Sequence, residues 1–230
     1  MSDNQIIERI IKLRDQSGLT QEGVANKIGI SRQLWILVEQ GRRDLNTEEL
    51  GKIAKLFGVD VADLFVEIPN LKKFRQMYFA CLRYGANKQG NVPKTKLAKL
   101  LYLVDFTNFF QELEPMSGVK YRRLEYGPVP DVFFSVTDDL LEKGKINIQI
   151  LDKGAQLVSS RSIDNDTSEL SDCEISRIKD ICELWRDKPT QEIVNFTHEQ
   201  KPWKSCRDGE YIPYSLIIQE DPGHVYQPVA

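Results

Sequence analysis

Two histidines and four cysteines are the side chains of this sequence best suited to catalysis or metal binding. His198 is followed directly by Glu199, a pair that suggests general acid and base chemistry, and Cys206 is near in sequence. Neighbouring residues of a helix point in different directions, and no third group is spaced to orient the pair. We therefore predict no catalytic residue, and we expect His198 to cap or hydrogen-bond where its helix meets the Pro202-Trp203 turn.

The spacing of the cysteines argues against a metal site. No Cys-x-x-Cys pair is present, and only His198 and His224 could join the thiols as ligands. The thiols belong to Cys81, Cys173, Cys182 and Cys206. The sequence also has no glycine-rich phosphate loop and no nucleophile elbow. We expect buried or idle thiols, no metal and no cofactor.

Arg32 and Gln33 are the residues whose types best suit binding to nucleic acid. Arginine can form a paired hydrogen bond with guanine, and glutamine can do so with adenine. Both follow Ser31, a residue type that caps helices. Taken alone, the two side chains would be a solvated helix face, so their interpretation depends on the helices around them.

Those helices form a small domain. Apolar residues recur at helical spacing over residues 5–15, 21–28, 32–40, 47–57 and 61–65. Thr20 caps the second helix and Gly29 closes it, while Gly41 and Gly58 end the third and fourth. The second and third helices, joined by a tight turn, form the bihelical unit that places its second helix in a DNA major groove.

This domain resembles the lambda-repressor-like, or Xre, family in the strings Leu19-Thr20-Gln21-Glu22, Ile28-Gly29-Ile30-Ser31-Arg32-Gln33, Glu39-Gln40-Gly41-Arg42-Arg43 and Phe57-Gly58-Val59. The resemblance implies that Arg32 and Gln33 meet base edges, that Gln21 hydrogen-bonds a phosphate, and that the two arginines after the helix approach the DNA backbone. The candidate DNA-binding residues are Gln21, Ser31, Arg32, Gln33, Leu37, Arg42 and Arg43.

One feature departs from the family pattern. Ile36 and Leu37 stand where the family usually has polar residues. Because Trp35 and Val38 can fill the core at helical spacing, Ile36 and Leu37 are expected to face outward. Exposed apolar residues there would meet thymine methyl groups, pack against a partner, or mark a loss of DNA binding.

Length, composition and charge indicate a folded protein of two domains. Apolar residues make up 41% of the 230 residues and charged residues 28%, which excludes a disordered chain. The net charge of −3 argues against coating nucleic acid through bulk charge, so phosphate contacts must come from a patch. No apolar run reaches the roughly 18 residues of a membrane span, and the start Met1-Ser2-Asp3-Asn4 carries no export signal. We expect a cytoplasmic protein without membrane contact.

A break at Ile68-Pro69-Asn70 predicts a domain over residues 1–68 and a second over 69–230. In the second we expect helices over residues 72–84, 96–110, 132–143, 171–186 and 190–199, of which 96–110 is central to the core. We also expect a strand within 119–125, a rigid turn over 126–130, a hairpin joining 145–150 to 155–159, a mobile loop over 160–168, and an irregular tail from Gln219. The predicted fold class is mainly α, a five-helix domain followed by a mostly helical α+β domain with a small β-hairpin.

The second domain resembles the Panacea domain, also met as the SocA-like or GepA-like domain, in three strings. They are Lys96-Leu97-Ala98-Lys99-Leu100-Leu101-Tyr102-Leu103-Val104-Asp105-Phe106, Leu124-Glu125-Tyr126-Gly127-Pro128-Val129, and Thr197-His198-Glu199-Gln200-Lys201-Pro202-Trp203. The resemblance implies an antitoxin domain that binds a toxin protein and holds it inactive, while the fused Xre domain represses the shared operon. The candidate toxin-binding residues are Tyr126, Gly127, Pro128, His198 and Trp203; Trp203 could instead be a packing anchor.

Two functions of different classes remain open at this stage. The first is an antitoxin of a type II toxin-antitoxin system, as met in phage defence, which binds its cognate toxin and represses its operon as a homodimer on a palindromic operator. The second is a phage-type transcriptional repressor whose second domain oligomerises or senses a ligand. A toxic gene adjacent in one operon favours the first function. A divergent promoter facing unrelated genes favours the second.

Overall fold

The computed structural model describes residues 3–59, 61–64, 69–161 and 166–227. The chain divides into two compact units, Met1–Ile68 and Pro69–Ala230, and each is described by itself. Phe65, the last residue of the fifth predicted helix, and the middle of the predicted loop over 160–168 lie outside the described residues.

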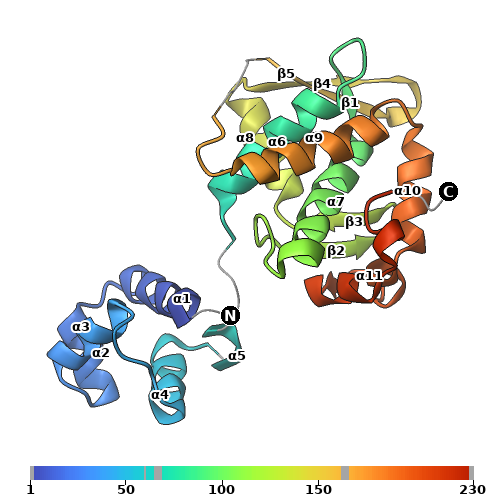
Figure 1. Cartoon of the computed structure of the whole chain (residues 1–230). Helices are drawn as coiled ribbons and strands as arrows, with labels where there is room; N and C mark the ends of the chain where they lie inside the picture. Colours follow the sequence, from blue (N-terminus) through green and yellow to red (C-terminus); the bar gives the residue numbers. More distant parts are fainter. Residues whose placement is uncertain (1–2, 60, 65–68, 162–165, 228–230) are drawn as a thin grey trace. The chain divides into compact units, whose positions relative to one another are not determined.

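The described residues of the first unit form five helices, shown in blue to teal in Figure 1. They are α1 (Asp3–Gln16), α2 (Gln21–Ile28), α3 (Arg32–Glu39), α4 (Thr47–Phe57) and α5 (Val61–Leu64). The predicted caps are confirmed, because the Thr20 and Ser31 side chains accept the backbone N–H groups of Gly23 and Leu34. Gly29 and Gly58 take the left-handed conformation that ends α2 and α4.

The core of this unit forms where the apolar faces of the helices meet. Trp35 and Val38 of α3 are buried, as their helical spacing predicts. The other fully buried residues of this core include Ile10, Val24, Ala25, Ile28 and Ile53. The sequence of α3 therefore fixes which face of the helix turns inward, and it leaves the side chains of Arg32 and Gln33 exposed.

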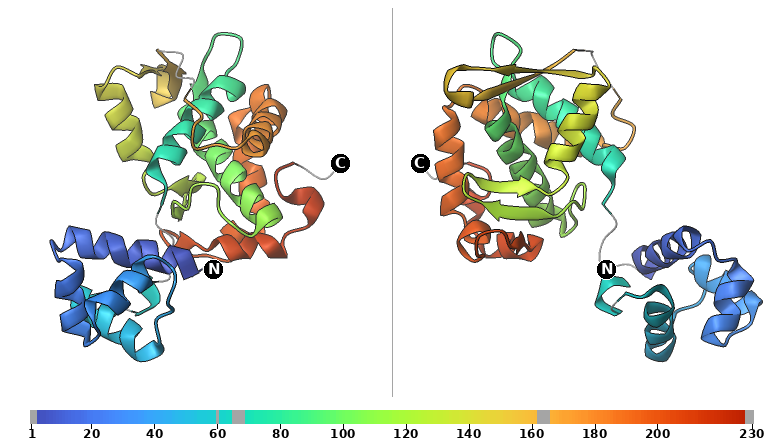
Figure 2. Two further views of the ribbon diagram at one scale, coloured as in Figure 1. Left: turned by 60° about the vertical axis from the view of Figure 1, so that its left-hand side comes forward. Right: turned by 180° about the vertical axis from the view of Figure 1, so that it is seen from behind.

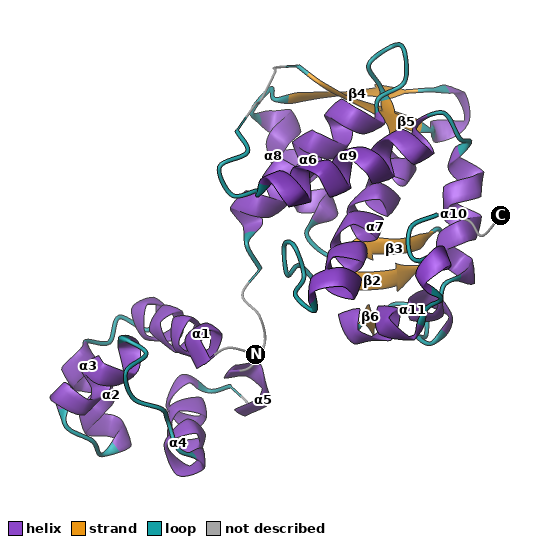
Figure 3. Ribbon diagram, viewed as in Figure 1, coloured by secondary structure: helices purple, strands orange, loops and turns teal. Residues whose placement is uncertain are grey.

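The second unit is built around α7 (Lys94–Glu112), whose residues from Lys96 to Asn108 are all buried. Around it lie α6 (Leu71–Gly85), α8 (Phe133–Glu142), α9 (Asp172–Arg186), α10 (Thr190–Glu199) and the short α11 (Lys201–Lys204), as Figure 3 shows by secondary structure. The central position expected for this helix is confirmed, since α6, α9 and α10 all contact it. Among the described residues, no helix has the length and apolar character needed to span a membrane.

Two three-stranded antiparallel sheets complete the second unit, and both are visible from behind in Figure 2. The first sheet has the order β1-β5-β4, from strands β1 (Val92–Pro93), β5 (Gln156–Ser160) and β4 (Ile146–Ile150). Its β4-β5 pair is the predicted hairpin. The second sheet has the order β3-β2-β6, from strands β3 (Gly127–Pro130), β2 (Tyr121–Leu124) and β6 (Tyr211–Ile212).

Strand β3 corrects one expectation, because the segment Tyr126–Pro130 was predicted to be a rigid turn. Only Glu125 and Tyr126 form the turn, and the following four residues pair with β2. The prolines at 128 and 130 are compatible with this because β3 is an edge strand. Two residues apart, their missing N–H groups fall on the same side of the strand, away from the ladder.

The tail also differs from the expected irregular segment. Within the segment expected to be irregular, Pro222–His224 form a short 3-10 helix. Another 3-10 helix, Tyr214–Gln219, comes directly before it. The Gln200 side chain donates hydrogen bonds to the backbone oxygens of His224 and Val225, and Val225 is buried. The end of the described chain is thus packed against α10 and α11 of the second unit.

Candidate functional site

The first candidate site is the exposed start of α3. Ser31 uses its side chain to cap α3, and the two residues that follow, Arg32 and Gln33, are exposed. Helix α2 packs against α3 across the tight turn, which gives the arrangement that presents the second helix of such a pair to the major groove. Among the described residues, Arg32 and Gln33 form no side-chain hydrogen bond or ion pair, so both are available to base edges.

A partly buried carboxylate holds this pair of helices in place. Glu39, at the end of α3, accepts hydrogen bonds from Arg14 Nε, Gln21 Nε2 and Trp35 Nε1, each 2.7 Å long. These donors come from α1, α2 and α3, so one side chain joins three helices. Sequence reasoning missed Glu39, although its position four residues after Trp35 places both on one helix face.

The other predicted DNA-binding residues have different environments. Gln21 donates its hydrogen bond to Glu39, so a phosphate contact would have to use its remaining donor or replace that bond. Arg42 is exposed, whereas Arg43 forms an ion pair of 2.7 Å with Glu49 of α4. The hydrogen bond from Arg43 holds the pKa of the Glu49 carboxyl below its ordinary value. Arg43 therefore already has a structural role within the unit.

Ile36 and Leu37 are half-buried rather than facing fully outward. The exposed apolar residue on α3 is instead Leu34, in the first turn beside Arg32 and Gln33. Ile36 and Leu37, the two residues that depart from the family pattern, therefore expose less apolar surface than the sequence suggested. Leu37 remains a candidate for apolar contact only through the part of its side chain that is exposed.

In the second unit, the three segments that carry the family resemblance meet around Gly127. A Cβ atom added at Gly127 would lie 2.8 Å from Lys99 Cε of α7 and 2.9 Å from Thr197 Oγ1 of α10. The φ angle of Gly127 is +97°, a conformation that residues with a Cβ rarely adopt. Both the space and the backbone therefore require glycine here.

Lys99 is the least expected member of this cluster, because only 1% of it is exposed. Its Nζ donates to the backbone oxygen of Pro128 at 3.0 Å. Burial disfavours the charged ammonium and lowers the pKa of Lys99 to about 7. The burial of Lys99 was not predicted, since the sequence analysis named this residue only within a segment of family resemblance.

His198 and Trp203 stack on each other, with ring centres 4.0 Å apart. The Arg123 guanidinium lies 3.7 Å from the centre of the Trp203 ring. Burial lowers the pKa of His198, and the positive charges of Lys99 and Arg123 lower it further. The predicted hydrogen bond or cap by His198 is not what the structure has. Its Nε2 is buried without a hydrogen-bond partner among the described residues, and stacking fixes the ring instead.

Only one of the five predicted toxin-binding residues is well exposed. Tyr126, in the turn between β2 and β3, has 63% of its surface exposed, whereas Gly127 and Pro128 are buried. Tyr126 lines a cavity of about 360 Å³ together with Lys99, Phe133 and Phe134. His198 and Trp203 are half-buried, and Trp203 packs against the apolar core.

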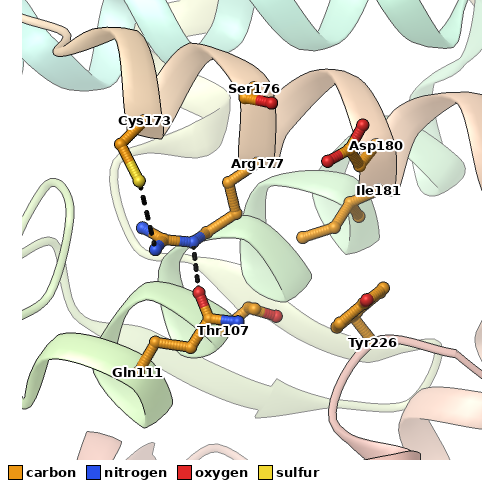
Figure 4. A pocket seen from close by; sticks show the side chains of 8 residues that line it. All are labelled: Thr107, Gln111, Cys173, Ser176, Arg177, Asp180, Ile181 and Tyr226. Carbon is orange, nitrogen blue, oxygen red and sulfur yellow. Dashed lines mark hydrogen bonds between the residues drawn. The ribbon is translucent and has the colours of Figure 1, made fainter.

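A second pocket, of about 180 Å³, lies between α7, α9 and Tyr226 (Figure 4). Arg177 of α9 crosses it, donating from Nε to Gln111 Oε1 at 2.7 Å and forming an ion pair of 2.8 Å with Glu112. Cys173 lies 3.8 Å from Arg177 Nη2. Because its donors bond side chains of α7, Arg177 joins two helices, and we assign no ligand to this pocket.

The four cysteines are free thiols, of which Cys81 and Cys182 are buried. Across the part of the chain that the structure describes, no three His, Cys, Asp or Glu side chains gather in a way that could hold a metal ion.

The fold and the exposed start of α3 define the first unit as a helix-turn-helix DNA-binding domain. Residues 8–64 match a helix-turn-helix domain family, and residues 97–204 match the family described as antitoxin SocA-like, Panacea domain. Through its first domain the chain belongs to the helix-turn-helix transcriptional regulators. Its second domain is similar to the SocA-like, Panacea antitoxin domain over the matched residues. These families and the relatives below are regulators and antitoxins rather than enzymes.

Two relatives are similar in sequence to part of this chain, over 48 and 56 residues. An uncharacterised HTH-type transcriptional regulator of Methanocaldococcus jannaschii, MJ0272, is 48% identical over 48 residues, which are 21% of this chain and 73% of that protein. The cryptic phage CTXphi transcriptional repressor RstR of Vibrio cholerae is 38% identical over 56 residues, 24% of this chain and 50% of that protein.

The crystal structure of ComR from Streptococcus suis aligns with 86% of this chain. The alignment spans about half, 54%, of the ComR chain. The identity is 14% and the TM-score 0.27, too low to support a comparison.

Proposed function

We propose that this chain is the antitoxin of a type II toxin-antitoxin system, which neutralises a protein toxin through its second unit and represses its own operon through its first. The observation that carries the proposal is the fusion of a helix-turn-helix domain to a SocA-like antitoxin domain. The helix-turn-helix domain makes DNA a partner, and the antitoxin-like domain indicates a protein partner.

For the DNA-binding part, we propose that Arg32 and Gln33 contact base edges and that Arg42 contacts phosphate. Their exposure supports this role, as does the Glu39 carboxylate that fixes α3 relative to α1 and α2. Gln21 and Arg43 support the interface by their internal hydrogen bonds, and Ser31 by capping α3. Domains of this type bind two half-sites as dimers, so the proposed operator is palindromic and the proposed active form is a homodimer.

For the toxin-binding part, we propose that Tyr126 makes direct contact with the toxin. Its exposure of 63% in a turn between two strands supports this. The remaining candidates, Gly127, Pro128, His198 and Trp203, would act by holding the turn in place, since they are buried or half-buried.

The test is to express the product of the neighbouring gene, with and without this chain, from two unrelated promoters. Because neither promoter contains the operator, repression cannot explain a rescue of growth. Rescue by the full chain carrying both Arg32→Ala and Gln33→Ala supports neutralisation by protein contact. Growth arrest that persists with the wild-type chain refutes it.

The second candidate is a phage-type repressor whose second unit oligomerises or senses a ligand. The similarity of the first domain to a phage repressor favours it. It predicts intact repression in a reporter assay and no rescue in the test above. It also predicts a divergent promoter facing unrelated genes.

A further inference from the structure

The cavity at Tyr126 is bordered by apolar side chains that are unusually exposed. Phe134 of α8 has 52% of its surface exposed, and Ile150 of β4 has 70%. Ile150 pairs directly with Gln156 of β5, which lines the cavity. Because directly paired residues lie on the same face of a sheet, Ile150 extends the apolar border beyond the cavity itself. Exposed apolar surface gathered around a cavity is typical of a protein interaction site.

The ionisable groups of the cavity are both lysines, Lys94 and Lys99, and no carboxylate is among the described residues that line it. Lys94 Nζ lies 5.4 Å from the centre of the Phe134 ring, within range of a cation-π interaction. Among the described residues, Lys94 has no ion pair. Lys99 is buried and its Nζ donates to the oxygen of Pro128, so Lys94 is the cation that a ligand of the cavity can reach. The cavity therefore favours an anionic group beside an apolar one.

We propose that this cavity receives an apolar side chain of the toxin polypeptide, with a neighbouring Asp or Glu carboxylate of the toxin paired to Lys94. The proposal rests on the proposed function. Tyr126 and Phe134 would cover the apolar side chain, and the pair with Lys94 would be a charge-assisted hydrogen bond. A polypeptide fits better than a small molecule because the apolar border continues onto Ile150. A molecule confined to about 360 Å³ would leave that border exposed.

The test measures binding of the purified full chain to the purified product of the neighbouring gene. Phe134→Asp is expected to weaken binding by about tenfold or more, as loss of an aromatic anchor does. Lys94→Glu is expected to weaken it more than Lys94→Gln, because only the first reverses the charge. The matched control is Ile218→Asp, which changes an apolar residue that is 49% exposed and does not line the cavity. It should bind like the wild type.

A charge-reversal selection tests the partner's chemistry. Toxin variants that restore binding to the Lys94→Glu chain should replace Asp or Glu by Lys or Arg. Circular dichroism must show native folding of each variant; if Phe134→Asp does not fold, Lys94→Gln and the selection decide.

If the wild-type chain binds and its Phe134 and Lys94 variants bind equally well, this inference fails while the proposed function stands. The same holds if Ile218→Asp weakens binding as much as they do. If the wild-type chain does not bind the toxin, the proposed function fails and the inference falls with it.

Discussion

At the scale of single residues, the two candidate sites depend on opposite properties. Arg32 and Gln33 are proposed to contact DNA through exposed side chains, whereas Gly127 is required because it has no side chain. Lys99 belongs to neither type, since it is an ionisable group enclosed by apolar neighbours. Each residue therefore predicts a different measurable effect of substitution.

Arg32→Ala is expected to cost about 1–3 kcal/mol of operator affinity if Arg32 contacts a base. The loss should be specific to one base position of each half-site, which a mobility-shift series with altered operators can detect. Lys55→Ala, an exposed change on α4, is the control and should leave affinity unchanged. Equal affinity of Arg32→Ala and the wild type would remove Arg32 from the interface.

Gly127→Ala is expected to destabilise the second unit more than Gly209→Ala. Both glycines have positive φ angles, so both substitutions carry a backbone cost of about 1–2 kcal/mol. Only at Gly127 would the new Cβ collide with Lys99 and Thr197, because nothing lies within 4 Å of a Cβ at Gly209. Urea unfolding measures the difference, and equal losses would contradict the close approach of the three segments.

The lowered pKa of Lys99 predicts that the free energy of unfolding depends on pH. The folded state gives up the Lys99 proton near pH 7, while the unfolded chain holds it to about its ordinary pKa of 10.5. Between pH 7 and 8.5 the unfolded state thus binds more protons, and the free energy of unfolding rises with pH by up to about 1.4 kcal/mol per unit. Cys81 limits this pH range from above. Burial raises the pKa of its thiol well above 9.0, so near pH 9 the unfolded chain loses this proton first, which offsets the rise due to Lys99.

The measurement compares urea midpoints of the wild type and Lys99→Met at pH 7, 7.75 and 8.5. Burial also lowers the pKa of Lys96, which both proteins contain. The difference between the two proteins therefore gives the contribution of Lys99 alone. The Lys99→Met protein should show a smaller rise. Parallel curves would mean that Lys99 is charged in the folded state throughout this range.

At the scale of elements, the sequence predicted what local signals determine. Thr20, Ser31, Gly29 and Gly58 mark helix ends through contacts within a few residues, and those ends are confirmed. The apolar pattern of residues 96–110 similarly identified the central helix.

What the sequence did not predict depends on contacts between distant residues. Strand β6 has two residues and exists because it pairs with β2, about 90 residues earlier. The three hydrogen bonds to Glu39 and the burial of Lys99 likewise require the folded arrangement of several helices. Of the candidate sites, the residue types at the start of α3 were identifiable, whereas Phe134 and Lys94 beside the cavity were not.

Glu39→Ala is expected to destabilise the first unit by about 3 kcal/mol. The substitution removes the charged acceptor that the side chains of Arg14, Gln21 and Trp35 share. Glu22→Ala, an exposed change on α2, is the control. Circular dichroism during urea unfolding measures both. A loss below 0.5 kcal/mol, taken as roughly the range of a surface substitution, would show that apolar packing alone sets the arrangement of α1, α2 and α3.

At the scale of the whole molecule, the chain joins a DNA-binding unit to a unit from an antitoxin-like family. The two units have separate cores, so a substitution in one is expected to leave the binding partner of the other unaffected. Under the proposed function, this separation would let one chain act on a promoter and on a protein.

The most direct test of this account is calorimetric titration of the purified chain with the purified product of its neighbouring gene. The account predicts saturable binding that survives the double substitution Arg32→Ala and Gln33→Ala and is weakened by Phe134→Asp. Absence of heat and of a complex on size-exclusion chromatography, in a sample that still binds operator DNA, would contradict it.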